Sequence, residues 1–130
     1  MRQELSITTE IIDETTLNHS RRLSAGMGAV VQFLGVVREL EGERAISAID
    51  YEAFVPMARH QFGKIFDEID SRWSVESIRL VHRIGRVPVN EPSLWVEVIA
   101  PHRGEAFEAC QYLIHEMKKR VPIWKRIIEL

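Results

Sequence analysis

Hydrophobic residues recur at helical spacing in two long segments of this chain, and each segment predicts an amphipathic helix with one core-facing side. The first begins at Pro56, because proline is tolerated in the first turn of a helix. Its apolar positions are Met57, Phe62, Ile65, Phe66, Ile69 and Trp73. The second runs from Glu105 to Arg120, and its apolar positions are Phe107, Cys110, Leu113, Ile114 and Met117.

Strand patterns occupy much of the remaining chain. The near-continuous apolar run from Ala29 to Arg38 predicts a strand that is covered on both faces. Asp13 is placed to cap a short helix over residues 14–23, with Leu17 and Leu23 as its inward candidates. A charged turn around Gly42 should separate the long apolar strand from the next one. The other predicted strands cover residues 6–12, 45–54, 77–84 and 93–100, with a turn region at 85–92.

This mixed order of elements predicts an α+β fold with a mixed, largely antiparallel sheet and two long amphipathic helices. A length of 130 residues fits one domain over residues 1–130, large enough to bury a core without disulfides or metal. The single cysteine excludes an intrachain disulfide and fits a reducing cytoplasm. No apolar run is long enough for a membrane span, and the N-terminus lacks a secretory pattern. The net charge of -2 disfavours a general nucleic-acid binder.

Positive charge is nevertheless concentrated at the C-terminal end, where the final thirteen residues hold five Lys or Arg and one acid. Pro122 lacks a backbone N–H, so the preceding helix should end at or just before Val121. Lys118 then lies on the last helical turn, and Lys125 lies on an irregular segment beyond it. Two ammonium groups that approach one point from different backbone segments predict an anion site.

Three other cations are candidates for the same site. His102 and Arg103 lie between the last strand and the last helix, where helix N–H groups favour anions. Arg38 ends the apolar strand, and a guanidinium can hold a phosphate or carboxylate through two hydrogen bonds. Each has a simpler interpretation as a solvated strand end, a polar loop or, for Lys118, a favourable charge at a helix C-terminus. Spacing alone leaves both interpretations open.

Other reactive residue types predict structural roles. Cys110 falls on the apolar stripe of its helix, which predicts a buried thiol rather than a nucleophile. The remaining histidines show no metal-ligand spacing, so neither a metal nor a cofactor is expected. We expect Trp124 to anchor the C-terminal segment in the core rather than to stack on a ligand.

Several short strings, each weak alone, occur together in an order that resembles the large, catalytic subunit of molybdopterin synthase. The resemblance covers about residues 7–126, and the Pro-X-Trp-Lys string after a basic helix end is its most specific element. The strings are Gly35-Val36-Val37-Arg38, Tyr51-Glu52-Ala53-Phe54-Val55-Pro56-Met57, Val81-His82-Arg83-Ile84-Gly85, Pro101-His102-Arg103, Ala106-Phe107-Glu108-Ala109 and Lys118 through Lys125.

The resemblance implies an α/β-hammerhead-like fold and a sulfurtransferase reaction. Such subunits convert cyclic pyranopterin monophosphate (precursor Z) into molybdopterin, with sulfur from a thiocarboxylate on the C-terminal Gly-Gly of a small ubiquitin-like subunit. It further implies a homodimer within a heterotetramer, with residues of both large subunits near each pocket. By motif, the catalytic residues are Lys118 and Lys125. The substrate-binding residues implied in the same way are Val36, Val37, Arg38, His102, Arg103 and Arg126.

One difference from the family pattern lies at the C-terminal end. Relatives usually have an acidic residue shortly after the Trp-Lys segment, whereas this chain continues with Ile127 and Ile128. Contacts of that tail with partners are therefore open. Two alternatives remain: a non-catalytic anion-binding or scaffold homologue, and a small regulatory dimer that binds a nucleotide through the same cationic loops.

Overall fold

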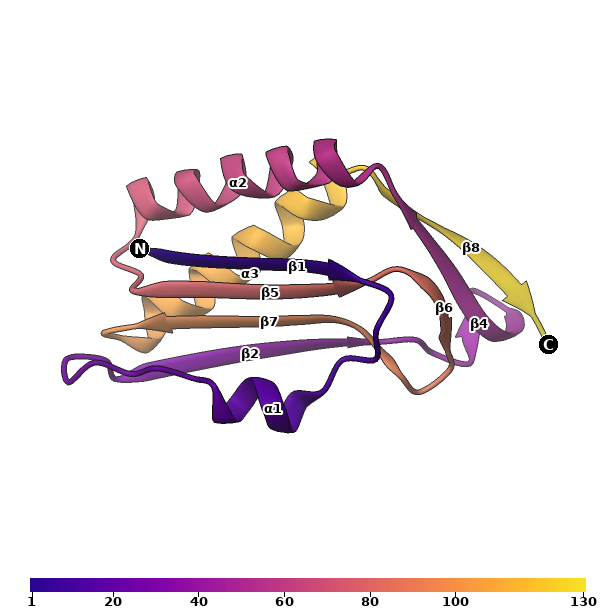
Figure 1. Ribbon diagram of the computed structural model, residues 1–130, viewed down its shortest axis with the longest axis horizontal. Coiled ribbons are helices and arrows are strands. Elements are labelled where there is room, and N and C mark those ends of the chain that lie inside the picture. The colour runs from indigo at the N-terminus through magenta and orange to yellow at the C-terminus, as the bar shows by residue number, and fades with distance from the viewer.

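Two sheets and two long helices make up the computed structural model, which describes residues 1–130 (Figure 1). The two long helices cover one face of a four-stranded sheet, and a smaller sheet lies beyond one end of that sheet. The helices are α1 (Glu14–His19), α2 (Val55–Arg72) and α3 (Arg103–Arg120). The strands are β1 (Arg2–Thr8), β2 (Ala29–Val36), β3 (Leu40–Glu41), β4 (Arg44–Ala53), β5 (Ser77–Arg83), β6 (Gly85–Pro88), β7 (Pro92–Ala100) and β8 (Ile123–Glu129).

The larger sheet has the strand order β1-β5-β7-β2. Strand β1 is parallel to β5, whereas β5 with β7 and β7 with β2 are antiparallel, so the sheet is mixed and largely antiparallel as predicted. In the smaller sheet, β4 pairs with β3, β6 and β8, all antiparallel. The α+β class is confirmed, and none of the helices combines the length and apolar character that a membrane span needs.

The main core lies between the larger sheet and the helices α2 and α3. Successive strand residues alternate between the two faces of the sheet, so every second residue points into this core. Leu80, Val96 and Val98 point toward the helices, where they meet the buried stripe of α2. That stripe consists of Phe62, Ile65, Phe66 and Ile69 as predicted. Two expected members of the helical stripes are wrong: Met57 is 42% exposed and Phe107 is 61% exposed. Both lie near the N-terminal end of their helix.

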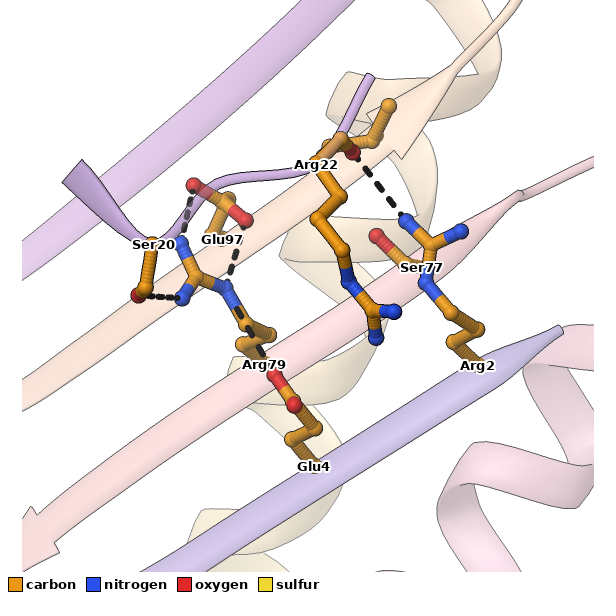
Figure 2. A pocket seen from close by; sticks show the side chains of 8 residues that line it. Arg2, Glu4, Ser20, Arg22, Ser77, Arg79 and Glu97 are labelled. Atoms are coloured by element: carbon orange, nitrogen blue, oxygen red, sulfur yellow. Dashed lines mark hydrogen bonds and ion pairs between the residues drawn. The ribbon is translucent and has the colours of Figure 1, made fainter. Parts of the chain in front are cut away.

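The opposite face of the larger sheet carries a buried charge cluster under α1, shown in Figure 2. Arg79 on β5 donates two hydrogen bonds to Glu97 on β7 and one to Ser20 beside α1. Arg21 donates a further bond to Glu97, whose side chain is completely buried. Burial alone would raise the pKa of Glu97, but the bonds and charges of the two arginines outweigh it and hold that pKa below its ordinary value.

Several predicted boundaries are wrong for identifiable reasons. The first strand is Arg2–Thr8 rather than residues 6–12, because parallel pairing with β5 sets its limits. Asp13 caps α1 as predicted, with its carboxylate accepting from the Thr16 N–H, but the helix ends at His19 and Leu23 is 56% exposed. The expected turn over 85–92 contains the short strand β6.

Strand β2 is less buried than its sequence predicts. Its apolar sequence predicts cover on both faces, yet β2 lies at the edge of the sheet. Val30, Phe33 and Leu34 are each 37% exposed, and Val36 is 43% exposed. An edge strand of this composition offers unpaired backbone groups beside apolar side chains, which is how two chains commonly associate.

Candidate functional site

A cavity of about 840 Å³ opens where the C-terminal end of α3 meets both sheets. Strand β2 contributes Val36 and the chain just beyond it contributes Arg38, while α3 contributes Lys118 and β8 contributes Lys125. The two lysines predicted as the catalytic pair therefore line the same cavity. Tyr51, His82 and Trp124 also line the cavity.

The local sequence explains how the two lysines meet. Helix α3 ends at Arg120, and Val121 caps it with an N–H bond to the Met117 carbonyl, as Pro122 predicts. The chain then turns into β8, so the expected irregular segment is a strand. Its pairing with β4 places Lys125 opposite Tyr51 and fixes the direction of the lysine. Trp124 is 57% exposed and lines the cavity, so its predicted role as a core anchor is wrong.

Glu41 on β3 forms an ion pair with Lys125, with 2.7 Å between Oε1 and Nζ. The hydrogen bond from Lys125, together with the charges of Lys125 and Arg38, lowers the pKa of Glu41. A carboxylate of the chain itself therefore lies beside two of the cations that were predicted to bind an anion. Sequence analysis identified only a charged turn here, since the pairing depends on how the β3–β4 hairpin folds back toward β8.

Two of the other predicted residues lie outside the cavity wall. Val37 is only 2% exposed and packs with Ile46, Ile49 and Val87 in the small core of the second sheet. Arg126 on β8 pairs with Asp50 at 2.9 Å and does not line the cavity. Within one chain, neither side chain lies at the site.

His102 and Arg103 lie at the other end of α3. His102 caps the helix through its backbone, with its exposed ring 3.4 Å from Glu105. Fifteen residues separate Arg103 from Lys118, which at the rise of a helix corresponds to about 22 Å. One copy of the chain therefore does not bring these residues to the two lysines. Their predicted role at the site requires a second copy.

Two titratable residues of the cavity wall, Tyr51 and His82, were not among the predicted site residues. The rings of Tyr51 and His82 meet edge to face, with 5.3 Å between their centroids. His82 is 5% exposed, and its Nδ1 lies 2.8 Å from the Arg83 carbonyl oxygen. Burial lowers the pKa of His82. The sequence offered one signal, which is that both residues fall within strings that carry the family resemblance.

The remaining reactive groups behave as structural residues. Cys110 is buried on the core side of α3, as predicted, and burial raises the pKa of its thiol to about 11. No group of three or more His, Cys, Asp or Glu side chains is arranged to hold a metal ion. The titratable side chains that line the cavity are Arg38, Tyr51, His82, Lys118 and Lys125.

Comparison with known proteins shows the family of this chain. Residues 7–120 match the family model described as MoaE protein. The molybdopterin synthase catalytic subunit of Thermoplasma volcanium is 41% identical over 112 residues, which cover 86% of this chain and 80% of that protein. This chain belongs to the MoaE family.

Solved structures show the same fold. The crystal structure of molybdopterin synthase from Staphylococcus aureus matches with a TM-score of 0.87 at 34% identity, over 96% of this chain and 90% of that chain. A protein–protein complex of subunits 1 and 2 of molybdopterin-converting factor from Helicobacter pylori matches with a TM-score of 0.79 at 22% identity. That match covers 96% of this chain and 88% of the other.

Proposed function

We propose that this chain is the catalytic subunit of a molybdopterin synthase. It transfers sulfur from the C-terminal thiocarboxylate of a small ubiquitin-like carrier to cyclic pyranopterin monophosphate, and so forms the dithiolene of molybdopterin. The observation that carries the proposal is the convergence of Arg38, Lys118 and Lys125 on one cavity in a chain of the MoaE family. The reaction takes place in the cytoplasm and needs no metal or cofactor in this chain.

The cations match the charge that develops in this reaction. Opening the cyclic phosphate and adding sulfur both increase negative charge, and fixed positive groups stabilise such a transition state more than the ground state. Arg38 suits the phosphate because its guanidinium donates two parallel hydrogen bonds. Lys118 transfers the proton, and Lys125 positions the thiocarboxylate or the phosphate. The exchange of these two lysine roles is the alternative assignment.

The chemistry of the carrier adds a second step. Its sulfur is bonded to the carbonyl carbon of the terminal glycine, so attack on the pterin links carrier and pterin through an acyl–sulfur bond. Release of the carrier requires water to cleave that bond, and installing two sulfurs requires the cycle to occur twice. The same cations would stabilise the oxyanion that forms during hydrolysis.

A second copy of the chain would complete the site. A two-fold axis near the middle of α3 would set two α3 helices antiparallel, and would bring His102 and Arg103 of one copy toward Lys118 of the other. The exposed apolar residues support this arrangement, since Phe33 and Phe107 both line the groove between β2 and α3 that would be covered. A carrier at each distal end would then give a heterotetramer.

The test combines this chain with thiocarboxylated carrier and precursor, and measures formation of the dithiolene product. Replacing Lys118 by Ala should lower turnover about 100-fold or more, because a positioned proton donor or acceptor typically contributes that much. Lys119→Ala is the matched control, since the adjacent lysine is 59% exposed and pairs with Glu116. Near-normal turnover by Lys118→Ala would refute its role. Absence of product with the unmodified chain would favour the non-catalytic scaffold.

A further inference from the structure

His82 has a defined protonation state within the cavity. It lies near the end of β5 on the same side as Leu80, the side that the helices cover. Its Nδ1 is 2.8 Å from the Arg83 carbonyl oxygen. A carbonyl only accepts hydrogen bonds, so Nδ1 carries the hydrogen and donates it. The second ring nitrogen, Nε2, is then unprotonated in the neutral ring and has a free lone pair.

This lone pair is unusual among the groups of the cavity wall. Arg38, Lys118 and Lys125 are hydrogen-bond donors only while they are charged. Neutral His82 therefore supplies a nitrogen base to a cavity that three cations also line. The ring is held in place by the Arg83 carbonyl and by the edge-to-face contact with Tyr51. Burial favours the neutral ring, since it disfavours the charged imidazolium.

We propose that His82 is a catalytic residue that activates the water which releases the carrier. Its Nε2 takes a proton from water while the water oxygen bonds to the glycine carbonyl carbon. The carbon–sulfur bond then breaks, and its electron pair leaves on the pterin sulfur as a thiolate. The carrier departs as a carboxylate, and His82 returns its proton to solvent. No oxidant or reductant takes part.

The inference rests on the proposed function, because it assigns a residue to the release step of that reaction. It assigns the proton transfers of the two steps to different residues: Lys118 acts in sulfur transfer, whereas His82 acts in the hydrolysis that follows. A residue with only a structural role would slow both steps together. A single-turnover experiment that observes the covalent carrier–pterin adduct by mass spectrometry distinguishes the two roles.

The variant His82→Asn is the sharpest test, because its amide nitrogen takes the place of Nδ1 and can still donate to the Arg83 carbonyl. Adduct formation should stay within about threefold of the wild-type rate, whereas adduct hydrolysis should slow about 100-fold. The adduct would therefore accumulate. His60→Asn is the control, because His60 is exposed on α2 outside this cavity and should leave both steps unchanged.

The pH profile of adduct hydrolysis gives a second measurement, which the wild type supplies on its own and which His82→Asn controls. In the wild type this rate should fall as pH drops below 6.5 and His82 becomes protonated, because the protonated ring cannot accept a proton. The other titratable or charged groups of the wall are Tyr51 on β4, Lys118 on α3, Lys125 on β8, and Arg38. These groups are present in the wild type and in His82→Asn, so their effects on the pH profile should appear equally in both proteins.

The outcomes are distinct. Adduct accumulation in His82→Asn, or an acid loss of hydrolysis in the wild type, supports the assignment. Carrier release at the wild-type rate by His82→Asn, or an equal slowing of both steps, overturns it. If His82→Asn does not fold, a flat wild-type profile overturns it instead. A wild-type chain that forms neither adduct nor product would overturn the proposed function, and this inference with it.

Discussion

Replacing Glu97 by Gln should destabilise the protein more than any comparable change of a surface acid. The Glu97 carboxylate is completely buried and accepts three hydrogen bonds, two from Arg79 and one from Arg21. Arg79 is itself only 9% exposed, and its guanidinium lies 4.9 Å from the centre of the Trp95 ring. Glutamine preserves the shape of the side chain but leaves two arginine charges without their counter-charge.

The size of the effect follows from burial. Removing one partner of a buried ion pair costs about 3–5 kcal/mol, because it leaves an uncompensated buried charge. Glutamine keeps one acceptor oxygen, so the lower end of about 3 kcal/mol applies. A chain of 130 residues has an unfolding entropy of about 0.27 kcal/mol/K, so the melting temperature should fall by about 11 °C.

The matched control is Glu4→Gln. Glu4 also lies near Arg79, at 3.8 Å, but its side chain is 57% exposed (Figure 2). An exposed pair contributes at most about 1 kcal/mol. Both variants can be compared with the unmodified protein by thermal and urea unfolding.

The same variant predicts a change in pH dependence. Because the pKa of Glu97 is lower in the folded state than its ordinary value of 4.5, the folded state gains stability from ionised Glu97 above about pH 4.5. That gain is lost as pH falls through the folded pKa. The stability difference between wild type and Glu97→Gln should therefore shrink on acidification. A Glu97→Gln protein as stable as Glu4→Gln at neutral pH would refute the reasoning.

Three further predictions concern the site and the core. If both copies build each site, mixing inactive Lys118→Ala and Arg103→Ala proteins should restore up to about a quarter of the activity, since a mixed dimer has one intact site; no recovery would contradict the shared site. Glu41→Gln should tighten binding of inorganic phosphate by up to about fivefold in calorimetry, because a competing exposed ion pair is removed, whereas Glu43→Gln should not. Cys110, with its pKa raised to about 11, should react only slowly with iodoacetamide at pH 8 unless the protein is unfolded.

Local signals predicted the elements whose limits are set by neighbouring residues. Pro122 predicted the end of α3, and Asp13 predicted the start of α1. Predictions failed where pairing with a distant strand determines the structure of a segment. The segment after Pro122 becomes β8 only because β4 offers it an edge, and β2 is exposed because nothing in this chain pairs with its outer side. Neither fact is written in the local pattern of apolar residues.

The candidate site shows the same division. Lys118 and Lys125 were predicted from sequence as candidates because a helix end before Pro122 separates their backbone segments, whereas the pairing of β8 with β4 places Lys125 at the cavity. The ion pairs of Glu41 with Lys125 and of Arg126 with Asp50 could not be predicted from sequence, since they depend on how distant strands pair. The place of His82 likewise required the two sheets to meet.

The sequence by itself determined the fold class, the two helical stripes, the family and the cationic residue types that an anionic substrate needs. Only the tertiary structure decided which of those cations share a cavity. It also showed that α3 holds His102 and Arg103 about 22 Å from the lysines within one copy. The physical reason is that local spacing fixes backbone direction over a few residues, whereas contacts between distant segments depend on strand register and sheet order.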